Sequence, residues 1–515
     1  MYFIRGLPYY YITDFVIIVY TIAMKFSTQW LSLCFVMSVI SCASSSPDEE
    51  PPMGFTSYIG LNHSTAHYRS SPDAPAYYID SQKGNDAHDG RSADRPWQSL
   101  SRLHSVILVP GDVVRLCRGS VWTGESLFFD NGSAGSALKP VIIEAYGKGD
   151  LPHITKPAAL WDKNKTWPAI SFGQNASSTA PGAWIRILDL HVSHIPGVAI
   201  ALNGKSHDIL IAGCEISQSA MGVSIAGENQ KVIGCYIHDG VMGMDSGDPS
   251  KDWGANGVGV RGKNIEIAWN YFYRCIAPSK SFGTDGGAIE FFGYDSDAGS
   301  GWEYLSDNIM IHHNGSDGSD CFIEANGKVT RMLLSYNVSV NSPNGALLFH
   351  LNTIRTDTYY QVTLAHNVLD ARNSQKDGWG LIGLLVDWNN LTSPNLALSS
   401  LTARNNIFIT NYAIMSWINP IGNRLVHDHN VIHLVNDGRL SVNKDIWPAN
   451  GETLGDPLFT DPASGDYSLT GKSPAIRAGL PIDGDTSWKA EALAVDLAGK
   501  RYQLSDTADC GAFSY

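Results

Sequence analysis

The stretch Ile309-Met310-Ile311-His312-His313-Asn314 carries the pattern that decides the fold: alternating apolar residues, then a small or polar pair that ends in asparagine. The same pattern recurs from about residue 206 onward, with final positions at 214, 235, 270, 314, 337, 367, 406 and 430, where the final residue is cysteine at 214 and 235 and asparagine at the others. The steps between them are 21, 35, 44, 23, 30, 39 and 24 residues. A basic step in the low twenties with a variable excess predicts one coil of three short strands per repeat, with loops inserted at one corner.

The repeated asparagine has a physical role at that corner. Asparagine tolerates the left-handed backbone conformation of a tight turn. Its side-chain amide can also bond the asparagine of the next coil, which satisfies buried polar groups coil by coil. We therefore expect stacked asparagines, such as Asn314, Asn337 and Asn367, inside an all-β parallel solenoid whose strand edges lie only at its two ends.

Both ends of the chain carry further motifs that suit this fold. They are Tyr77-Tyr78-Ile79-Asp80-Ser81, Gly84-Asn85-Asp86 and Pro96-Trp97 near the start, and Asp456-Pro457-Leu458-Phe459 and Asp509-Cys510-Gly511-Ala512-Phe513 near the end. With the repeats, they make the chain resemble right-handed parallel β-helix proteins of the pectate-lyase-like superfamily over roughly residues 76 to 515. This resemblance implies a single-stranded right-handed parallel β-helix with N- and C-terminal capping coils, and it indicates fold far better than substrate.

The composition agrees with one large exported domain. The chain has 515 residues, 50 glycines, 43% hydrophobic and 17% charged residues, which disfavours disorder. A formal net charge of −14 speaks against nucleic-acid binding. We expect a polysaccharide partner, a membrane contact only through a lipid anchor, and a monomer.

The N-terminal region resembles a bacterial lipoprotein signal. From Met24, which is an alternative start of the protein, a basic residue precedes an apolar stretch that ends at Ser41-Cys42. Cys42 is the predicted lipidation site, so the protein would be exported and anchored to the cell envelope, with an ordinary cleaved signal as the alternative. The predicted divisions are residues 1–42 as leader, 43–75 as tether, 76–160 as N-terminal cap and first coils, 161–455 as β-helix core with site loops, and 456–515 as closing coils.

The remaining cysteines do not form a zinc or disulfide pattern. Cys117, Cys214, Cys235, Cys275, Cys321 and Cys510 are scattered and contain no CxxC. We expect most of them to be buried small apolar residues.

The strand after each asparagine corner offers a candidate site. Alternation along a strand places every second residue outward. If Ile225, Val260, Ile289, Ile323, Phe349 and Val386 point inward, their successors form one outward column. That column reads Ala226, Arg261, Glu290, Glu324, His350 and Asp387. Neighbouring coils lie ~4.8 Å apart, so two stacked carboxylates would repel each other, a cost that hints at function. The alternative is a solvated column whose charges only satisfy one another.

Long insertions flank this column and bring tryptophans suited to stacking on sugar rings. We predict substrate contacts by Trp253, Trp302, Trp379 and Trp388, with Asp387 at the end of the column. Asp285, Glu290 and Glu324 provide hard oxygen ligands for a predicted Ca²⁺ ion.

Three functions remain open, and the first is a polysaccharide lyase that cleaves a uronate-containing glycan by β-elimination. The resemblance implies a cation that neutralises the developing charge, here Ca²⁺ on Glu290 and Glu324, with Arg261 on the uronate. His350 is the preferred base, with Lys263 as an alternative. The aspartate-rich calcium signature and the catalytic lysine context of pectate-cleaving families are missing.

The second function is a retaining glycoside hydrolase in which Glu290 is the acid/base and Glu324 the nucleophile. Retaining enzymes place their carboxyl groups ~5–5.5 Å apart, about the spacing of adjacent coils. The third is a non-catalytic glycan-binding surface protein. The sequence analysis ranks the lyase slightly above the hydrolase, and both above the binding protein.

Overall fold

The computed structural model describes residues 64–129, 132–156, 168–172, 182–292, 305–326, 328–351, 360–374, 382–386, 399–416, 425–436, 438–441, 448, 451–480, 495–500 and 507–515. Residues 1–49 and residues 50–515 are separate units, and all described residues belong to the second unit. The predicted leader with Cys42, and residues 43–63 of the predicted tether, lie outside the described residues.

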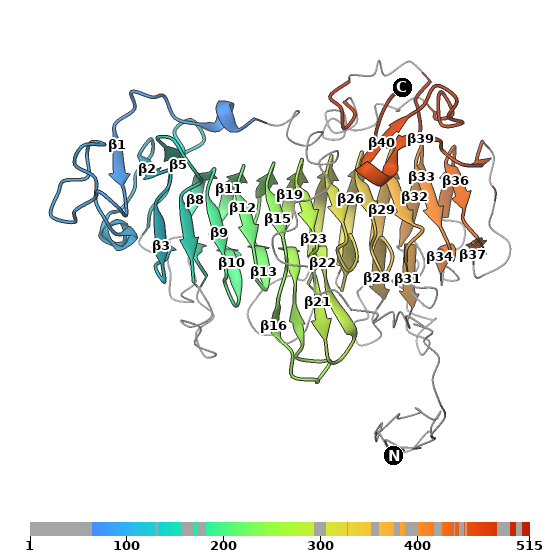
Figure 1. Ribbon diagram of the computed structural model, residues 1–515, viewed down its shortest axis with the longest axis horizontal. Helices are drawn as coiled ribbons and strands as arrows, with labels where there is room; N and C mark the ends of the chain where they lie inside the picture. Colours follow the sequence, from blue (N-terminus) through green and yellow to red (C-terminus); the bar gives the residue numbers. More distant parts are fainter. Residues whose placement is uncertain are drawn as a thin grey trace, which may run out of the picture. The chain divides into compact units, whose positions relative to one another are not determined.

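Three parallel sheets form the walls of a β-helix, which confirms the predicted parallel β-helix fold (Figure 1). Successive strands of the chain pass from sheet to sheet, so each strand pairs with its counterpart in the next coil.

The first sheet contains, in hydrogen-bonded order, β1 (Ala76–Ile79), β2 (Val113–Cys117), β5 (Val141–Tyr146), β8 (Ala183–Leu188), β11 (His207–Ala212), β14 (Lys231–Ile233), β19 (Lys263–Ala268), β23 (Leu305–His312), β26 (Lys328–Ser335), β29 (Tyr360–Ala365), β32 (Ser400–Arg404) and β35 (Leu425–Asp428).

The second sheet contains β4 (Leu127–Phe128), β7 (Ile170–Phe172), β10 (Val198–Leu202), β13 (Met221–Ile225), β18 (Asn256–Val260), β22 (Gly283–Phe291), β25 (Ile323–Ala325), β28 (Leu347–Leu351), β31 (Ile382–Val386), β34 (Ala413–Ser416) and β37 (Arg439–Ser441), with β21 (Ile276–Ser279) antiparallel to β22.

The third sheet contains β3 (Val121–Thr123), β6 (His153–Thr155), β9 (His191–Ser193), β12 (Glu215–Ser217), β15 (Tyr236–His238), β20 (Tyr271–Tyr273), β24 (Gly315–Asp317), β27 (Val338–Val340), β30 (Val368–Ala371), β33 (Ile407–Thr410), β36 (Val431–Leu434) and β38 (Thr453–Leu454). Outside these sheets lie β16 (Met242–Met244), β17 (Trp253–Gly254), β39 (Phe459–Asp461), β40 (Asp466–Leu469) and the 3₁₀ helices η1 (Thr65–Tyr68), η2 (Leu100–Ser105) and η7 (Pro462–Ser464).

The corner between the first and third sheets contains the predicted asparagine ladder. The side-chain Nδ2 of Asn314 donates to Oδ1 of Asn337 at 3.0 Å, and Asn337 repeats this bond to Asn367 at 2.9 Å. The ladder begins at Asn270 and continues through Asn406 to Asn430. Because each amide also donates to a backbone carbonyl, these buried polar groups are satisfied without water.

The left-handed residue at this corner is not the asparagine, and this part of the prediction was wrong. The residue before it adopts positive φ: Trp269 at 59°, His313 at 56° and Tyr336 at 53°. Bulky residues rarely adopt this conformation. Here their rings stack outside the ladder, with centroids 4.1 Å apart for Trp269 and His313 and 5.1 Å apart for His313 and Tyr336.

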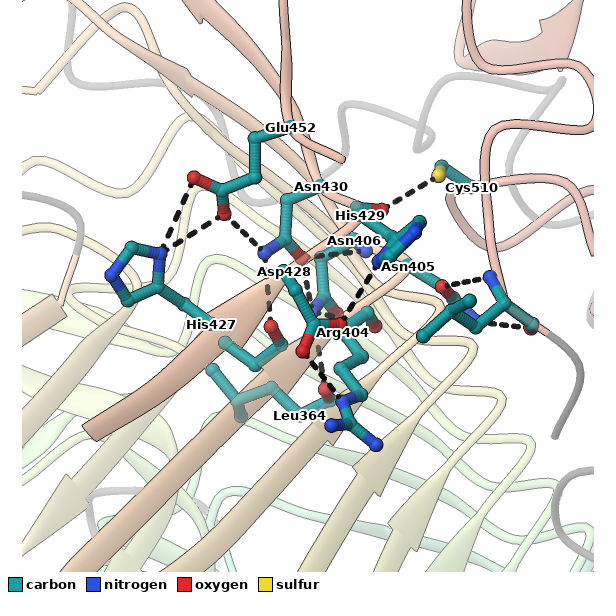
Figure 2. A network of polar contacts seen from close by, with 12 residues as sticks. Leu364, Arg404, Asn405, Asn406, His427, Asp428, His429, Asn430, Glu452 and Cys510 are labelled. Atoms are coloured by element: carbon teal, nitrogen blue, oxygen red, sulfur yellow. Dashed lines mark hydrogen bonds and ion pairs between the residues drawn. The ribbon is translucent and has the colours of Figure 1, made fainter. Parts of the chain in front are cut away.

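A buried carboxylate ends the ladder at its C-terminal side (Figure 2). Oε1 of Glu452 accepts from Nδ2 of Asn430 at 2.8 Å, and Glu452 also bonds Nδ1 of His427. The last asparagine amide therefore keeps an acceptor where no further asparagine follows.

The C-terminal segment covers the outer face of the third sheet in its later coils. Tyr467, Leu469 and Phe513 pack in one cluster with outward residues of the sheet such as Val338 and Ile407. The six cysteines outside the leader are free, and all but Cys117 are buried, as predicted. In the part of the chain that the structure describes, no helix has the length and apolar character needed to cross a membrane.

Candidate functional site

Glu290 and Glu324 occupy paired positions of β22 and β25 in the second sheet. The predicted neighbourhood of these two carboxylates is therefore present. Each follows a buried isoleucine, Ile289 or Ile323, that points into the core, so alternation turns both glutamates outward.

The rest of the predicted column is wrong. Glu290 pairs with Gly259 on β18, not with Arg261, and Glu324 pairs with Leu348 on β28, not with His350. In register, the outward column reads Ser224, Gly259, Glu290, Glu324, Leu348 and Gly383. Arg261 therefore lies two residues after Gly259, just past the end of β18, and His350 lies two residues after Leu348 on β28.

Two asparagine amides hold the carboxyl group of Glu290. Nδ2 of Asn256 contacts Oε2, and Nδ2 of Asn326 donates to Oε1 at 3.2 Å. The same Nδ2 of Asn326 also donates to Oε1 of Glu324 at 3.3 Å. One amide nitrogen thus bridges the two carboxyl groups.

The electrostatic environment favours a proton on Glu290. Burial, the neighbouring charge of Glu324 and that of Asp285 raise the pKa of Glu290 well above its ordinary value, although the amides of Asn326 and Asn256 oppose this. Carboxylates this close cannot both ionise at low cost, so the pair retains a proton to higher pH than a free glutamate.

Asp285 lies on the same strand and is the third acidic group of this site. Burial, followed by the charge of Glu324, raises the pKa of Asp285 to about 7. Asp320 lies close by and accepts from Oγ1 of Thr284 at 2.7 Å and from Nδ2 of Asn344 at 3.0 Å. Burial raises the pKa of Asp320 despite these bonds.

A glycine and two large side chains form the other flank of Glu290. A Cβ atom added at Gly259 would lie 2.4 Å from Cε2 of Phe292 and 2.7 Å from the Met221 sulfur. The two side chains therefore cover the glycine beside Glu290. The guanidinium of Arg261 lies 5.8 Å from the centroid of the Phe292 ring.

The remaining predicted residues are placed as follows. Lys263 begins β19, in the first sheet rather than in the sheet that carries the two glutamates. Trp253 lies on β17, half-buried, with its indole against Gly243. Trp302, Trp379, Trp388, Asp387 and the side chain of His350 lie outside the described residues.

A projecting pair of hairpins stands beside the acidic group. It is formed by β16 with β17 and by β21 with the start of β22 (Figure 1). Met244 and Phe282 on it are 45% and 54% exposed. Asp252 ties the two hairpins together because it accepts from Ser246 and Ser281 at 2.7 and 2.5 Å.

The predicted calcium ion stays a prediction. Among the described residues, no three Asp, Glu, His or Cys side chains form a group that could hold a metal ion. Both carboxyl oxygens of Glu290 already contact asparagine amides. To bind Ca²⁺, a hard cation that prefers oxygen ligands, these carboxyl oxygens would have to give up their contacts with the amides.

Sequence reasoning missed Asn256, Asn326 and Asp320. Asn326 could have been found, since it lies two residues after Glu324 and alternation places it on the same face. Asn256 could not have been found from the sequence. It follows Gly254 and Ala255, which both adopt positive φ, so the alternation of the strand does not extend back through them.

No known family profile matches the chain. A 76-residue segment is 40% identical to the lacto-N-biosidase of Bifidobacterium longum subsp. longum, and it covers 14% of this chain and 5% of that protein. The chain therefore matches only a small part of this curated relative's length.

Solved structures of similar fold include a GH136 lacto-N-biosidase from Eubacterium ramulus, with 16% identity, a TM-score of 0.47 and coverage of 74% of this chain and 68% of that one. A pectate lyase has 13% identity, a TM-score of 0.45 and coverage of 85% and 96%. A rhamnogalacturonan lyase has 13% identity, a TM-score of 0.46 and coverage of 72% and 90%. At this identity the likeness concerns the fold alone.

Proposed function

We propose that this protein is a carbohydrate-active enzyme, a retaining glycoside hydrolase with Glu290 as acid/base and Glu324 as nucleophile. The observation that carries the proposal is the bridge that Asn326 makes between the two carboxyl groups. One nitrogen reaches both Oε1 atoms, at 3.2 and 3.3 Å, and the two glutamates pair on adjacent strands. Because adjacent strands lie ~4.8 Å apart, this pairing fits the ~5–5.5 Å carboxyl separation of retaining enzymes better than the ~6.5–9.5 Å of inverting ones. The short separation supports direct attack by one carboxylate.

The environment of Glu290 suits the acid/base role in this mechanism. Glu290 has the raised pKa that suits a general acid near neutral pH. Its proton would go to the glycosidic oxygen as that bond breaks, while a carboxylate oxygen of Glu324 forms an ester bond with the anomeric carbon. Glu290, now ionised, would take a proton from the water that cleaves this ester, and both glutamates return to their first state.

The partial match to a lacto-N-biosidase agrees with glycan hydrolysis as a class. It covers too little of either chain to name the substrate. A neutral oligosaccharide fits this site better than a uronate does, since an anionic substrate would be repelled by the carboxylate that Glu324 presents as nucleophile.

The polysaccharide lyase remains the second candidate. Its preferred base, the side chain of His350, lies outside the described residues, and the cation that it needs has no supporting cluster within them. Arg261, which is not in register with the glutamates, would have to reach the uronate from two residues along its strand.

A panel of neutral and uronate-containing glycans distinguishes these functions when each digest is read in two ways. New reducing ends without the ultraviolet absorbance of an unsaturated uronide support the hydrolase. That absorbance, lost with chelator, overturns it in favour of the lyase. Binding without any product would support the non-catalytic glycan-binding protein.

A mechanism-based probe then tests the assignment of the nucleophile. The 2-deoxy-2-fluoro glycosyl fluoride of the identified substrate sugar should leave one glycosyl group on the peptide that contains Glu324. Labelling at another residue, or inverted anomeric configuration of the product by NMR, would overturn the assignment.

We also propose that the protein is exported and lipid-anchored through Cys42. The leader motif that ends at Ser41-Cys42 supports this. Metabolic labelling with a fatty-acid analogue should mark the full chain but not the Cys42→Ser variant, and equal labelling of both would contradict the proposal.

A further inference from the structure

A pocket lies on the third sheet, away from the sheet that carries Glu290 and Glu324. Its volume is about 510 Å³, and its lining includes Arg118, Asp150, His153, His191 and Glu215. Small-molecule sites commonly measure ~300–1,000 Å³, so the pocket suits a short saccharide or a ligand of similar size.

Paired strands fix the three central side chains of this pocket. His153, His191 and Glu215 are register neighbours on β6, β9 and β12. The two imidazole rings stack with centroids 3.9 Å apart and an interplanar angle of 6°. Nε2 of His153 bonds Oγ of Ser193 at 2.7 Å, and Nε2 of His191 lies 3.6 Å from Oε1 of Glu215. The polar groups are therefore held in place before any ligand arrives.

The charge state of the pocket argues against a strongly charged ligand. Burial, with His191 and His194 nearby, lowers the pKa of His153 to about 4, and burial also lowers that of His191. The bond from His238 is the largest cause of the lowered pKa of Glu215. At neutral pH the imidazoles of His153 and His191 are neutral, and the pocket lining also includes Arg118, Asp150 and Glu215.

Neutral imidazoles, carboxylates and a guanidinium offer donors and acceptors side by side. Adjacent hydroxyl groups of a sugar match such a mixed set because each hydroxyl donates one hydrogen bond and accepts others. An anion would meet two carboxylates, and a metal ion finds no group of three Asp, Glu, His or Cys ligands in the described chain.

The course of the C-terminal segment leaves this part of the sheet accessible. The sheet residues in the cluster with this segment are buried from Tyr271 onward, and Tyr236 on β15 is partly buried against the cluster. The earlier strands β6, β9 and β12 carry histidine, glutamate and serine outward instead of large apolar residues. The outward side chains of the third sheet are therefore apolar where the C-terminal segment covers them and polar where the surface is open.

We infer that this pocket is a second saccharide-binding site, specific for an uncharged sugar unit and separate from the carboxylate pair. The pocket on the third sheet would bind a glycan, while the carboxylate pair on the second sheet would cleave it. Its occupation does not depend on whether the proposed hydrolysis is correct.

The experiment uses the full chain with Glu290→Gln and Glu324→Gln, so that no probe is degraded. Neutral oligosaccharides that contain hexose or N-acetylhexosamine are titrated by calorimetry, with oligogalacturonates as charged probes. Adding His191→Phe and Glu215→Gln keeps the ring stack, removes the hydrogen-bonding nitrogens of the imidazole and replaces one carboxylate acceptor with an amide donor. This double change should weaken neutral-glycan binding at least about tenfold. A matched pair of changes at exposed positions, His104→Phe and Glu228→Gln, should leave it unchanged.

Unchanged affinity in the pocket variant overturns the inference, as does stronger binding of oligogalacturonates or the absence of any neutral-glycan binding. If the pocket variant does not fold, Arg118→Ala decides the question, since Arg118 is only half-buried. In an otherwise wild-type chain, the pocket variant should keep its turnover of a short substrate. If the proposed hydrolysis is wrong, this turnover assay shows no product, whereas the calorimetric binding result is unaffected.

Discussion

Glu290 and Glu324 sit opposite each other on adjacent parallel strands, and the amide nitrogen of Asn326 hydrogen-bonds to both of them. Stacked acidic residues repel each other, and a solenoid that repeats the same outward position in every coil would repeat that repulsion. Here it is confined to one pair of coils, because Gly259 and Leu348 follow on either side. The acidic pair is a local feature and not part of a charged stripe.

Replacing either glutamate should abolish turnover without unfolding the protein. Glu290→Gln should lower kcat by about 10²–10⁴-fold, the usual contribution of a general acid, and Glu324→Gln by at least as much. Because Glu290 tends to hold a proton in the folded protein, glutamine is close to its native state, so Tm at neutral pH should not fall. Activity assays and thermal melts check this, with exposed Glu228→Gln as the control. Full activity in Glu290→Gln would contradict its role.

Removing the bridging amide should alter the pH profile rather than only the rate. The Asn326 amide opposes the upward shift of the Glu290 pKa, so Asn326→Ala should raise that pKa further. The limb of kcat/KM against pH that reports loss of the acid's proton should then move to higher pH, with a lower kcat. A variant that loses rate with an unmoved profile would show that Asn326 only stabilises the fold.

Asp285 should make the protein less stable as the solution becomes more alkaline. Its folded-state pKa is about 7, and an unperturbed aspartate has a pKa of about 3.9. Between these values the folded state binds the proton more tightly than the unfolded state, so the free energy of unfolding falls as pH rises. Asp285→Asn removes this dependence. The difference in Tm, variant minus wild type, should therefore grow from pH 4 to pH 8. A constant difference would show that Asp285 titrates normally.

Chelation distinguishes the proposed reaction from the one that the sequence ranked first. A retaining hydrolase with two carboxyl groups needs no metal ion, so dialysis against EDTA should leave kcat unchanged. Lost activity that returns specifically with Ca²⁺ would restore the calcium-dependent lyase prediction.

The asparagine ladder should contribute strongly to stability. Asn314→Ala removes an acceptor from the buried amide of Asn270 and a donor to Asn337, and an unsatisfied buried polar group costs about 1–3 kcal/mol. Asn373→Ala is the control, since its amide bonds Asn341 at the surface and should change stability by less than about 0.5 kcal/mol. Equal effects in urea unfolding would show that the ladder is not a major source of stability.

The site was predicted in part, and the errors have one cause. Alternation fixes which residues of a strand face outward, but a strand such as β28 offers two buried residues, Leu347 and Phe349, as equivalent reference points. Aligning on Phe349 selected His350, whereas the true register selects Leu348. Glu290 and Glu324 were paired correctly because Ile289 and Ile323 were chosen consistently.

The sequence by itself determined the coil, its asparagine corner and the inward and outward faces, since these depend on a repeat in the chain and on side-chain alternation within one strand. Only the tertiary structure decided the register between coils, because loops of variable length separate the strands and the hydrogen bonds between them fix their alignment. It also placed the left-handed conformation one residue before each asparagine, where stacked rings such as Trp269 and His313 stabilise it. Finally, it brought Asn256, Asn326 and Asp285 around the glutamates, and these contacts across separate strands set the protonation of Glu290.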